Sequence, residues 1–119
     1  MIVSIVDDDE NVRLATCSLL RSLGCDVREY ASAEAFLDSG HLGEVSCVIS
    51  DVQMPGMGGI EMQRKLGELN SALPIIFISA FGSEARRKEA LANGALCFLD
   101  KPVNGDAILA CLEKLSRST

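Results

Sequence analysis

Short apolar runs alternate with amphipathic stretches along the chain. Ile2–Val6, Ser46–Ser50 and Ile75–Ile78 are almost continuously apolar, which is typical of strands buried on both faces of a sheet. Asp26–Tyr30 is a more polar strand candidate that suits the edge of a sheet, and Ala95–Leu99 is the last candidate along the chain. The pattern therefore predicts five strands.

The stretches between and after these runs have the spacing of helices. The predicted helices are Glu10–Leu23, a short helix capped by Ser32 and running through Asp38, Ile60–Leu69, Ser83–Asn93, and a last helix that begins after its cap Asn104. Met54–Gly59 contains one proline and three glycines, which predicts a loop. Strand and helix thus alternate strictly.

A chain of 119 residues and 12.7 kDa has the size of a single domain. Strict alternation implies a parallel sheet with helices on both faces, joined by right-handed crossovers. Sheets of this doubly wound α/β class bind ligands at the carboxyl ends of their strands, near the point where the strand order reverses. The residues that follow each predicted strand are therefore the candidates for chemistry.

Composition narrows the range of functions. A net charge of −6 argues against direct nucleic-acid contact by this domain, because phosphate contacts need Lys and Arg patches. No apolar run reaches the length of about 18 residues that spans a membrane, and no secretory signal opens the chain, so a cytoplasmic location is expected. The five cysteines form no CxxC pair, which favours buried free thiols, and the single histidine, His41, disfavours Ser-His or Cys-His catalysis.

Charged and hydroxyl side chains follow the predicted strands. Asp7 and Asp8 follow the first, Asp51 the third, Ser79 the fourth and Lys101 the fifth. Crowded carboxylates repel one another, and a hard divalent cation such as Mg²⁺ relieves that repulsion. A lysine can hold a phosphoryl oxygen, and an aspartate beside both can accept a phosphoryl group as an acyl phosphate.

Each of these residues also has an ordinary explanation. Acids at Asp8–Glu10 are favoured by the dipole of the helix that follows, and Asp51 could cap a turn. Ser79 could be a loop hydroxyl, and Lys101 a solvated turn residue. Their coincidence at the same ends of alternating strands favours a shared site.

Four segments resemble the receiver domain of response regulators in bacterial two-component signalling, and the resemblance covers essentially the whole chain. They are IVDDDENVR at Ile5–Arg13, ISDVQMPGMGGIEM at Ile49–Met62, IFISAFG at Ile76–Gly82 and FLDKPV at Phe98–Val103. The resemblance implies a flavodoxin-like (βα)5 fold with a five-stranded parallel sheet in the order 2-1-3-4-5.

The resemblance also implies a role for each strand-end residue. Asp51 is the phosphoacceptor. Asp8 and Asp51 ligate Mg²⁺ together with the backbone carbonyl of Gln53, and Asp7 holds the metal through water. Lys101 neutralises the phosphoryl group.

Further implied roles concern the switch. Ser79, where threonine is commoner, hydrogen-bonds the phosphoryl oxygen, and Phe98, where tyrosine is common, swings inward behind it. The Lys101–Pro102 peptide bond is expected to be cis. Asp9 receives no role beyond charge at the helix start. The loop 80–83 is expected to move on phosphorylation.

These roles describe a phosphoacceptor switch rather than an enzyme acting on other molecules. The resemblance implies that a sensor histidine kinase donates the phosphoryl group to Asp51 and that the domain assists its own phosphorylation and dephosphorylation. The output surface then changes, with a phosphorylation-dependent homodimer expected through the fourth helix, fifth strand and fifth helix, or through the first and fifth helices.

Residues 1–119 are read as one receiver domain. The end of the chain suits a stand-alone receiver or the N-terminal part of a longer regulator. The run MPGMGGIEMQRKL is similar to receivers joined to helix-turn-helix transcription factors, which favours transcription regulation through a DNA-binding domain not present here.

Two alternatives belong to other classes. An aspartate-nucleophile phosphatase on a similar sheet usually carries a second acid two residues after the nucleophile, where Gln53 stands. A pseudo-receiver is disfavoured because the acids and the lysine at the strand ends are retained. A flavodoxin-like cofactor binder is disfavoured because few aromatic residues could stack on a flavin: the chain has Tyr30, four phenylalanines and no tryptophan.

Overall fold

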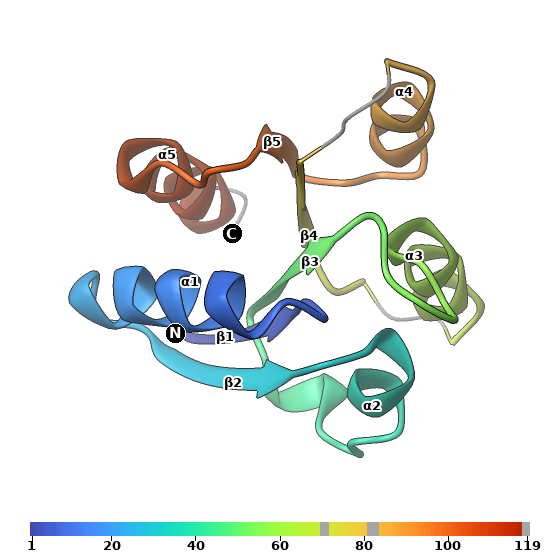
Figure 1. Cartoon of the computed structure of the whole chain (residues 1–119), viewed down its shortest axis with the longest axis horizontal. Coiled ribbons are helices and arrows are strands. Elements are labelled where there is room, and N and C mark those ends of the chain that lie inside the picture. Colours follow the sequence, from blue (N-terminus) through green and yellow to red (C-terminus); the bar gives the residue numbers. More distant parts are fainter. Residues whose placement is uncertain (70–71, 81–83, 118–119) are drawn as a thin grey trace.

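Five parallel strands form one sheet with helices on both faces (Figure 1). The computed structural model describes residues 1–69, 72–80 and 84–117. The strands are β1 (Ile2–Val6), β2 (Asp26–Tyr30), β3 (Cys47–Asp51), β4 (Ile75–Ser79) and β5 (Cys97–Asp100). Their order is β2-β1-β3-β4-β5, with every neighbouring pair parallel. This confirms the predicted order and the edge position of β2.

The helices lie close to their predicted ranges. They are α1 (Glu10–Ser22), α2 (Ala33–Leu37), α3 (Gly59–Glu68), α4 (Glu84–Ala92) and α5 (Gly105–Arg117), with a short 3₁₀ helix η1 (Leu42–Glu44) that the apolar pattern did not predict. Asp51, Ser79 and Asp100 are the last residues of their strands, whereas the sequence pattern placed them just after the strands. Backbone pairing continues one residue beyond the apolar run because a ladder hydrogen bond does not depend on the side chain.

Side-chain caps begin three of the helices. The Ser32 hydroxyl accepts a hydrogen bond from the Ala35 backbone, and Asn104 Oδ1 accepts from the backbone N–H groups of residues 106 and 107, as predicted. Asp9 accepts from the backbone N–H groups of Asn11 and Val12. Asp9 is therefore the N-cap of α1, a role that the sequence pattern did not assign.

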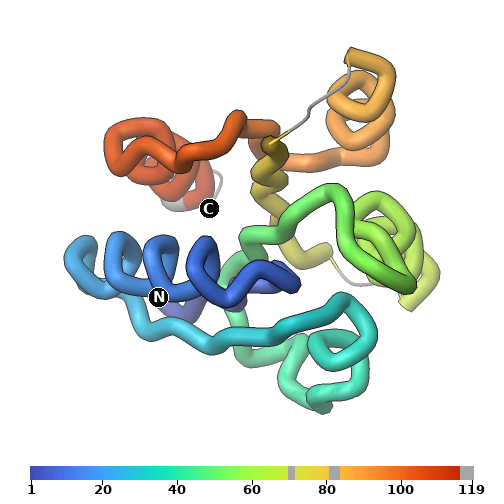
Figure 2. The backbone as a smooth tube through the Cα atoms, in the orientation of Figure 1, coloured from blue at the N-terminus to red at the C-terminus, as the bar shows by residue number. Residues whose placement is uncertain are grey.

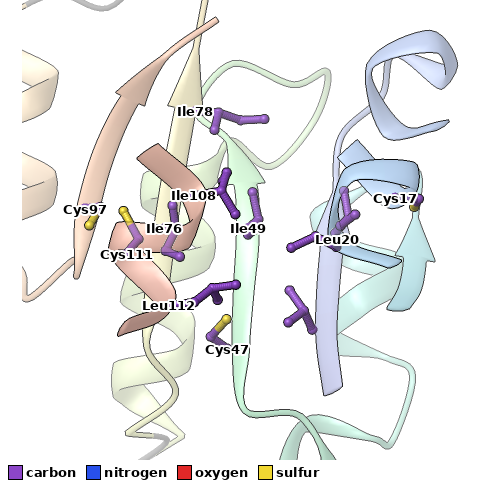
Figure 3. Close-up of a cluster of buried hydrophobic side chains, with 12 residues drawn as sticks. Cys17, Leu20, Cys47, Ile49, Ile76, Ile78, Cys97, Ile108, Cys111 and Leu112 are labelled. Carbon is purple, nitrogen blue, oxygen red and sulfur yellow. The ribbon is translucent and has the colours of Figure 1, made fainter. Parts of the chain in front are cut away.

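One half of the core lies between the sheet and helices α1 and α5 (Figure 3). Helix α5 contributes Ile108, Cys111 and Leu112, which are buried. The five cysteines are free, and four of them are buried. Burial raises the pKa of Cys17 to about 11 and that of Cys47 to about 12. These residues are protonated thiols that pack as small apolar side chains.

The other half of the core lies against α2, α3 and α4. Helix α4 contributes one buried residue, Ala90, so it is the least embedded of these helices. No helix within the described ranges is long and apolar enough to cross a membrane.

The chain reverses its direction of travel across the sheet between β1 and β3, as Figure 2 shows. It runs from β1 outward to the edge strand β2, then returns past β1 to form β3 and continues to β4 and β5. The carboxyl ends of β1 and β3 are therefore neighbours, with Val6 paired to Ser50. Such a reversal point is where open α/β sheets bind their ligands.

Candidate functional site

Three carboxylates meet at the reversal point. Asp7 and Asp8 directly follow β1, and Asp51 ends β3. One carboxylate oxygen from each lies within 4.8 Å of the others. Asp7 and Asp51 are buried, at 0% and 7% exposure, whereas Asp8 is exposed. The predicted acidic cluster is thus present, with one carboxylate open to solvent.

One ammonium group lies among these acids. Lys101 Nζ is 3.1 Å from Asp51 Oδ2 and 3.2 Å from Asp7 Oδ2. The Lys101–Pro102 peptide bond is cis, as expected, and the Lys101 backbone N–H donates to the Ser79 carbonyl at 2.9 Å. Lysine and acids that lie far apart along the sequence therefore share one site.

Charge in this site is unbalanced, because three carboxylates face one ammonium. Burial raises the pKa of Asp7, and the charge of Asp51 adds to the rise against the opposing effects of the Asp9 backbone N–H and Lys101. Burial lowers the pKa of Lys101, but the Asp51 and Asp7 carboxylates outweigh it and the net shift is upward. Lys101 is therefore firmly cationic, and the cluster still carries an excess of negative charge.

The donor set fits a hard divalent cation. Carboxylate oxygens are the ligands that Mg²⁺ prefers, and one or two of them with a carbonyl oxygen and waters complete its usual shell. The Gln53 backbone N–H donates to Asp51 Oδ1 at 3.3 Å, which keeps this peptide at the edge of the cluster. Asp8, exposed beside the buried pair, is open to an arriving ion.

The predicted switch residues lie on the two neighbouring strands. Ser79 ends β4 and is buried. Phe98 is on β5, where it pairs with Phe77 in register, and its side chain is already buried at 5% exposure. Phe98 is therefore a buried residue beside Phe77, and its inward movement stays a prediction. Ala80 is exposed, and Phe81, Gly82 and Ser83 of the predicted moving loop lie outside the described residues.

Two residues to which the sequence analysis assigned no role also shape the site. The Arg13 guanidinium donates to the Asp7 carbonyl at 2.7 Å and lies 3.6 Å from a Glu29 carboxylate oxygen, which fixes the turn that carries the acids. Gly59 packs against the backbone of Asp51 so closely that a side chain would collide with it. The glycine-rich run Met54–Gly59 signalled a loop, and its last glycine begins α3 instead.

Substitution of Asp7 by asparagine is expected to stabilise the metal-free fold at neutral pH. Because the folded pKa of Asp7 is raised above its ordinary value, its stabilising contribution exists at low pH and is lost as the pH rises through that folded pKa. Above it, a buried charge opposes folding. Asp7→Asn should therefore add about 1–3 kcal/mol to the free energy of unfolding at neutral pH.

Urea denaturation in the presence of a chelator measures this effect. The increase in the free energy of unfolding that Asp7→Asn causes should become smaller as the pH is lowered. Asp26→Asn, which neutralises an exposed acid at the start of β2, serves as the control and should change stability little. A variant less stable than the wild type at neutral pH would show that the ionised carboxylate of Asp7 supports the fold.

Known proteins are similar to this chain in sequence. The family model of the response regulator receiver domain matches residues 3–113. The response regulator protein TmoT of Ectopseudomonas mendocina is 44% identical over 112 residues, which is 93% of this chain and 50% of that protein. The transcriptional regulatory protein FixJ of Azorhizobium caulinodans is 37% identical over 117 residues, which is 98% of this chain and 56% of that protein. The chain thus spans about half the length of these relatives.

Solved structures share the fold. The crystal structure of FixJ-N has a TM-score of 0.87 at 35% identity and covers 99% of this chain and 94% of that chain. The response regulator StyR has a TM-score of 0.87 at 38% identity and covers 95% and 57% of the two chains. With the family match over residues 3–113, these likenesses show that the chain belongs to the response regulator receiver domain family, whose members are signalling domains.

Proposed function

We propose that this chain is a phosphorylation switch in which Asp51 accepts a phosphoryl group from a sensor histidine kinase. One observation carries the proposal: the buried Asp51 carboxylate lies 3.1 Å from Lys101 Nζ, with two further carboxylates within 4.8 Å. A nucleophile, a fixed cation and a set of hard oxygen ligands are the groups that phosphoryl transfer to an aspartate needs.

The transfer replaces a phosphorus–nitrogen bond of the donor with a phosphorus–oxygen bond to Asp51. An Asp51 carboxylate oxygen forms a bond to phosphorus, while the bond from phosphorus to the imidazole nitrogen of the donor breaks and the imidazole leaves. Lys101 offsets the charge on the phosphoryl oxygens, and Ser79 donates its hydroxyl hydrogen to one of them. Water is the acceptor in dephosphorylation: its oxygen forms a bond to phosphorus, the bond from phosphorus to the Asp51 oxygen breaks, and inorganic phosphate and the free carboxylate are released. The domain is proposed to assist this hydrolysis of its own acyl phosphate.

Mg²⁺ is the proposed cofactor. Asp8, Asp51 and the backbone carbonyl of Gln53 would hold it directly, and Asp7 would hold it through water. The ion supplies positive charge at the phosphoryl oxygens, where the transition state needs it. The excess negative charge of the cluster supports this assignment.

Intact-mass analysis with acetyl phosphate tests the function. The wild-type chain should gain one phosphoryl group in the presence of Mg²⁺ and none with a chelator. Asp8→Asn should require an Mg²⁺ concentration about tenfold higher or more for the same labelling, because a residue that would hold the ion directly is lost. Asp9→Asn makes the same chemical change one residue away and keeps a good N-cap for α1, so it should behave as the wild type. Labelling that is insensitive to Mg²⁺ would contradict the metal assignment.

The whole regulator is proposed to be longer than this domain. The chain matches about half of relatives that include transcriptional regulatory proteins, which supports residues 1–119 as the N-terminal receiver of a cytoplasmic transcription regulator. The net charge of −6 supports DNA contact by another domain.

The phosphorylated form is proposed to dimerise through the face of α4, β5 and α5. Sedimentation with beryllofluoride, a phosphoryl mimic, checks this, and an unchanged monomer would exclude it.

A further inference from the structure

Helix α4 is attached unevenly to the rest of the domain. Its second half is tied to α3, because Gln63 Nε2 donates to the Ala90 carbonyl at 3.0 Å and Arg64 lies 3.1 Å from the Glu89 carboxylate. Its first half, residues 84–88, is exposed. The attachment of that first half to the sheet therefore depends on long side chains.

Arg87 makes such an attachment. Its Nη1 donates to the Phe98 carbonyl on β5 at 3.1 Å, and its guanidinium carbon lies 5.9 Å from the centroid of the Phe98 ring. The second distance is within the range in which a cation is attracted to an aromatic face. One side chain therefore contacts both the backbone and the ring of the same residue.

The Phe98 ring is held from the sheet side as well. Its centroid lies 6.2 Å from that of Phe77 on β4, and the residue is buried. A ring that left this position would lose both the aromatic contact and the cation. Arg87 thus favours the buried orientation of Phe98 over an exposed one.

Phe98 is three residues before Lys101, whose ammonium contacts Asp51. We propose that Arg87 is a positioning residue, which holds Phe98 in its buried orientation and so couples the first half of α4 to the phosphorylation site. The inference rests on the proposed function, in which the buried Phe98 accompanies an occupied Asp51. If Phe98 leaves the buried position for part of the time, the apparent Kd of a phosphoryl mimic rises in inverse proportion to the fraction of Phe98 that stays buried.

The first arm of the test is NMR of the chain with ring-labelled phenylalanine and no mimic present. Phe98→Leu identifies the Phe98 signals among the four phenylalanines. Arg87→Ala should add a second set of Phe98 ring signals or broaden the first. Lys88→Ala removes the same charge from the next exposed position of α4 and should leave the Phe98 signals unchanged.

The second arm is calorimetric titration with beryllofluoride in the presence of Mg²⁺. Arg87→Ala should bind about threefold or more weakly than the wild type, as expected if the buried fraction of Phe98 falls to about a third, and Lys88→Ala should bind normally. Arg87→Gln keeps a hydrogen-bond donor without the cation and should fall between them.

Four results distinguish the possibilities. Normal ring signals and normal affinity in Arg87→Ala would overturn the coupling. Equal losses in Arg87→Ala and Lys88→Ala would reduce the effect to net charge and would overturn it as well. A second Phe98 conformer with unchanged affinity would leave Arg87 as a packing residue and overturn its coupling to the site. A wild type that binds no beryllofluoride would instead refute the proposed function, while the NMR arm still decides whether Arg87 positions Phe98.

Discussion

Asp51→Asn should abolish acyl-phosphate formation in this domain. The side chains of asparagine and aspartate have nearly the same shape, so Lys101 keeps its contact with Asp7 and the fold is retained. A carboxamide cannot provide the anionic oxygen that attacks phosphorus. With acetyl phosphate and Mg²⁺, the intact mass of the wild type should rise by one phosphoryl group, and that of the variant should not change.

Asp100→Asn is the matched control for this substitution. Asp100 is an exposed acid at the end of β5, one residue before Lys101, and it lies outside the three-carboxylate cluster. It should therefore be labelled as the wild type is. If Asp51→Asn gained the phosphoryl group as readily, the nucleophile would be another residue, and peptide mapping would identify it.

Gly59→Ala should destabilise the domain by about 1–3 kcal/mol, the usual cost of forcing an extra methyl group into a packed site. The added Cβ would lie 2.9 Å from Phe77 Cε1 and 3.2 Å from Val52 Cα, and it would collide with the Asp51 carbonyl oxygen. Two of these atoms are backbone, so they cannot rotate away. The collision outweighs the better helix propensity of alanine.

Gly67→Ala provides a control in the same helix. Among the described residues, the Cβ of that alanine would meet no heavy atom within 4 Å beyond its chain neighbours and the nearby backbone of its own helix, so its helix propensity acts alone. It should stabilise the domain by about 0.5–1 kcal/mol. Urea denaturation of both variants measures the difference, and stabilisation by both substitutions would show that helix propensity, rather than close packing against the Asp51 strand, governs Gly59.

Local sequence patterns predicted most of the architecture. Strands buried on both faces consist of apolar runs, and amphipathic helices repeat at about 3.6 residues, so each element leaves a signal in its own residues. The caps Ser32 and Asn104 were predictable for the same reason, because a capping side chain bonds to backbone groups two or three residues away. The motifs at the strand ends then indicated the family.

Tertiary structure alone decided how the site residues differ from one another. Asp7, Asp8 and Asp9 are identical in the sequence, but one is buried beside Lys101, one is exposed in the cluster and one caps α1. The contact of Arg87 with Phe98 likewise depends on where α4 lies against β5. Such differences arise from strand register and helix packing between distant segments, and a periodic pattern records only which way a side chain faces within its own element.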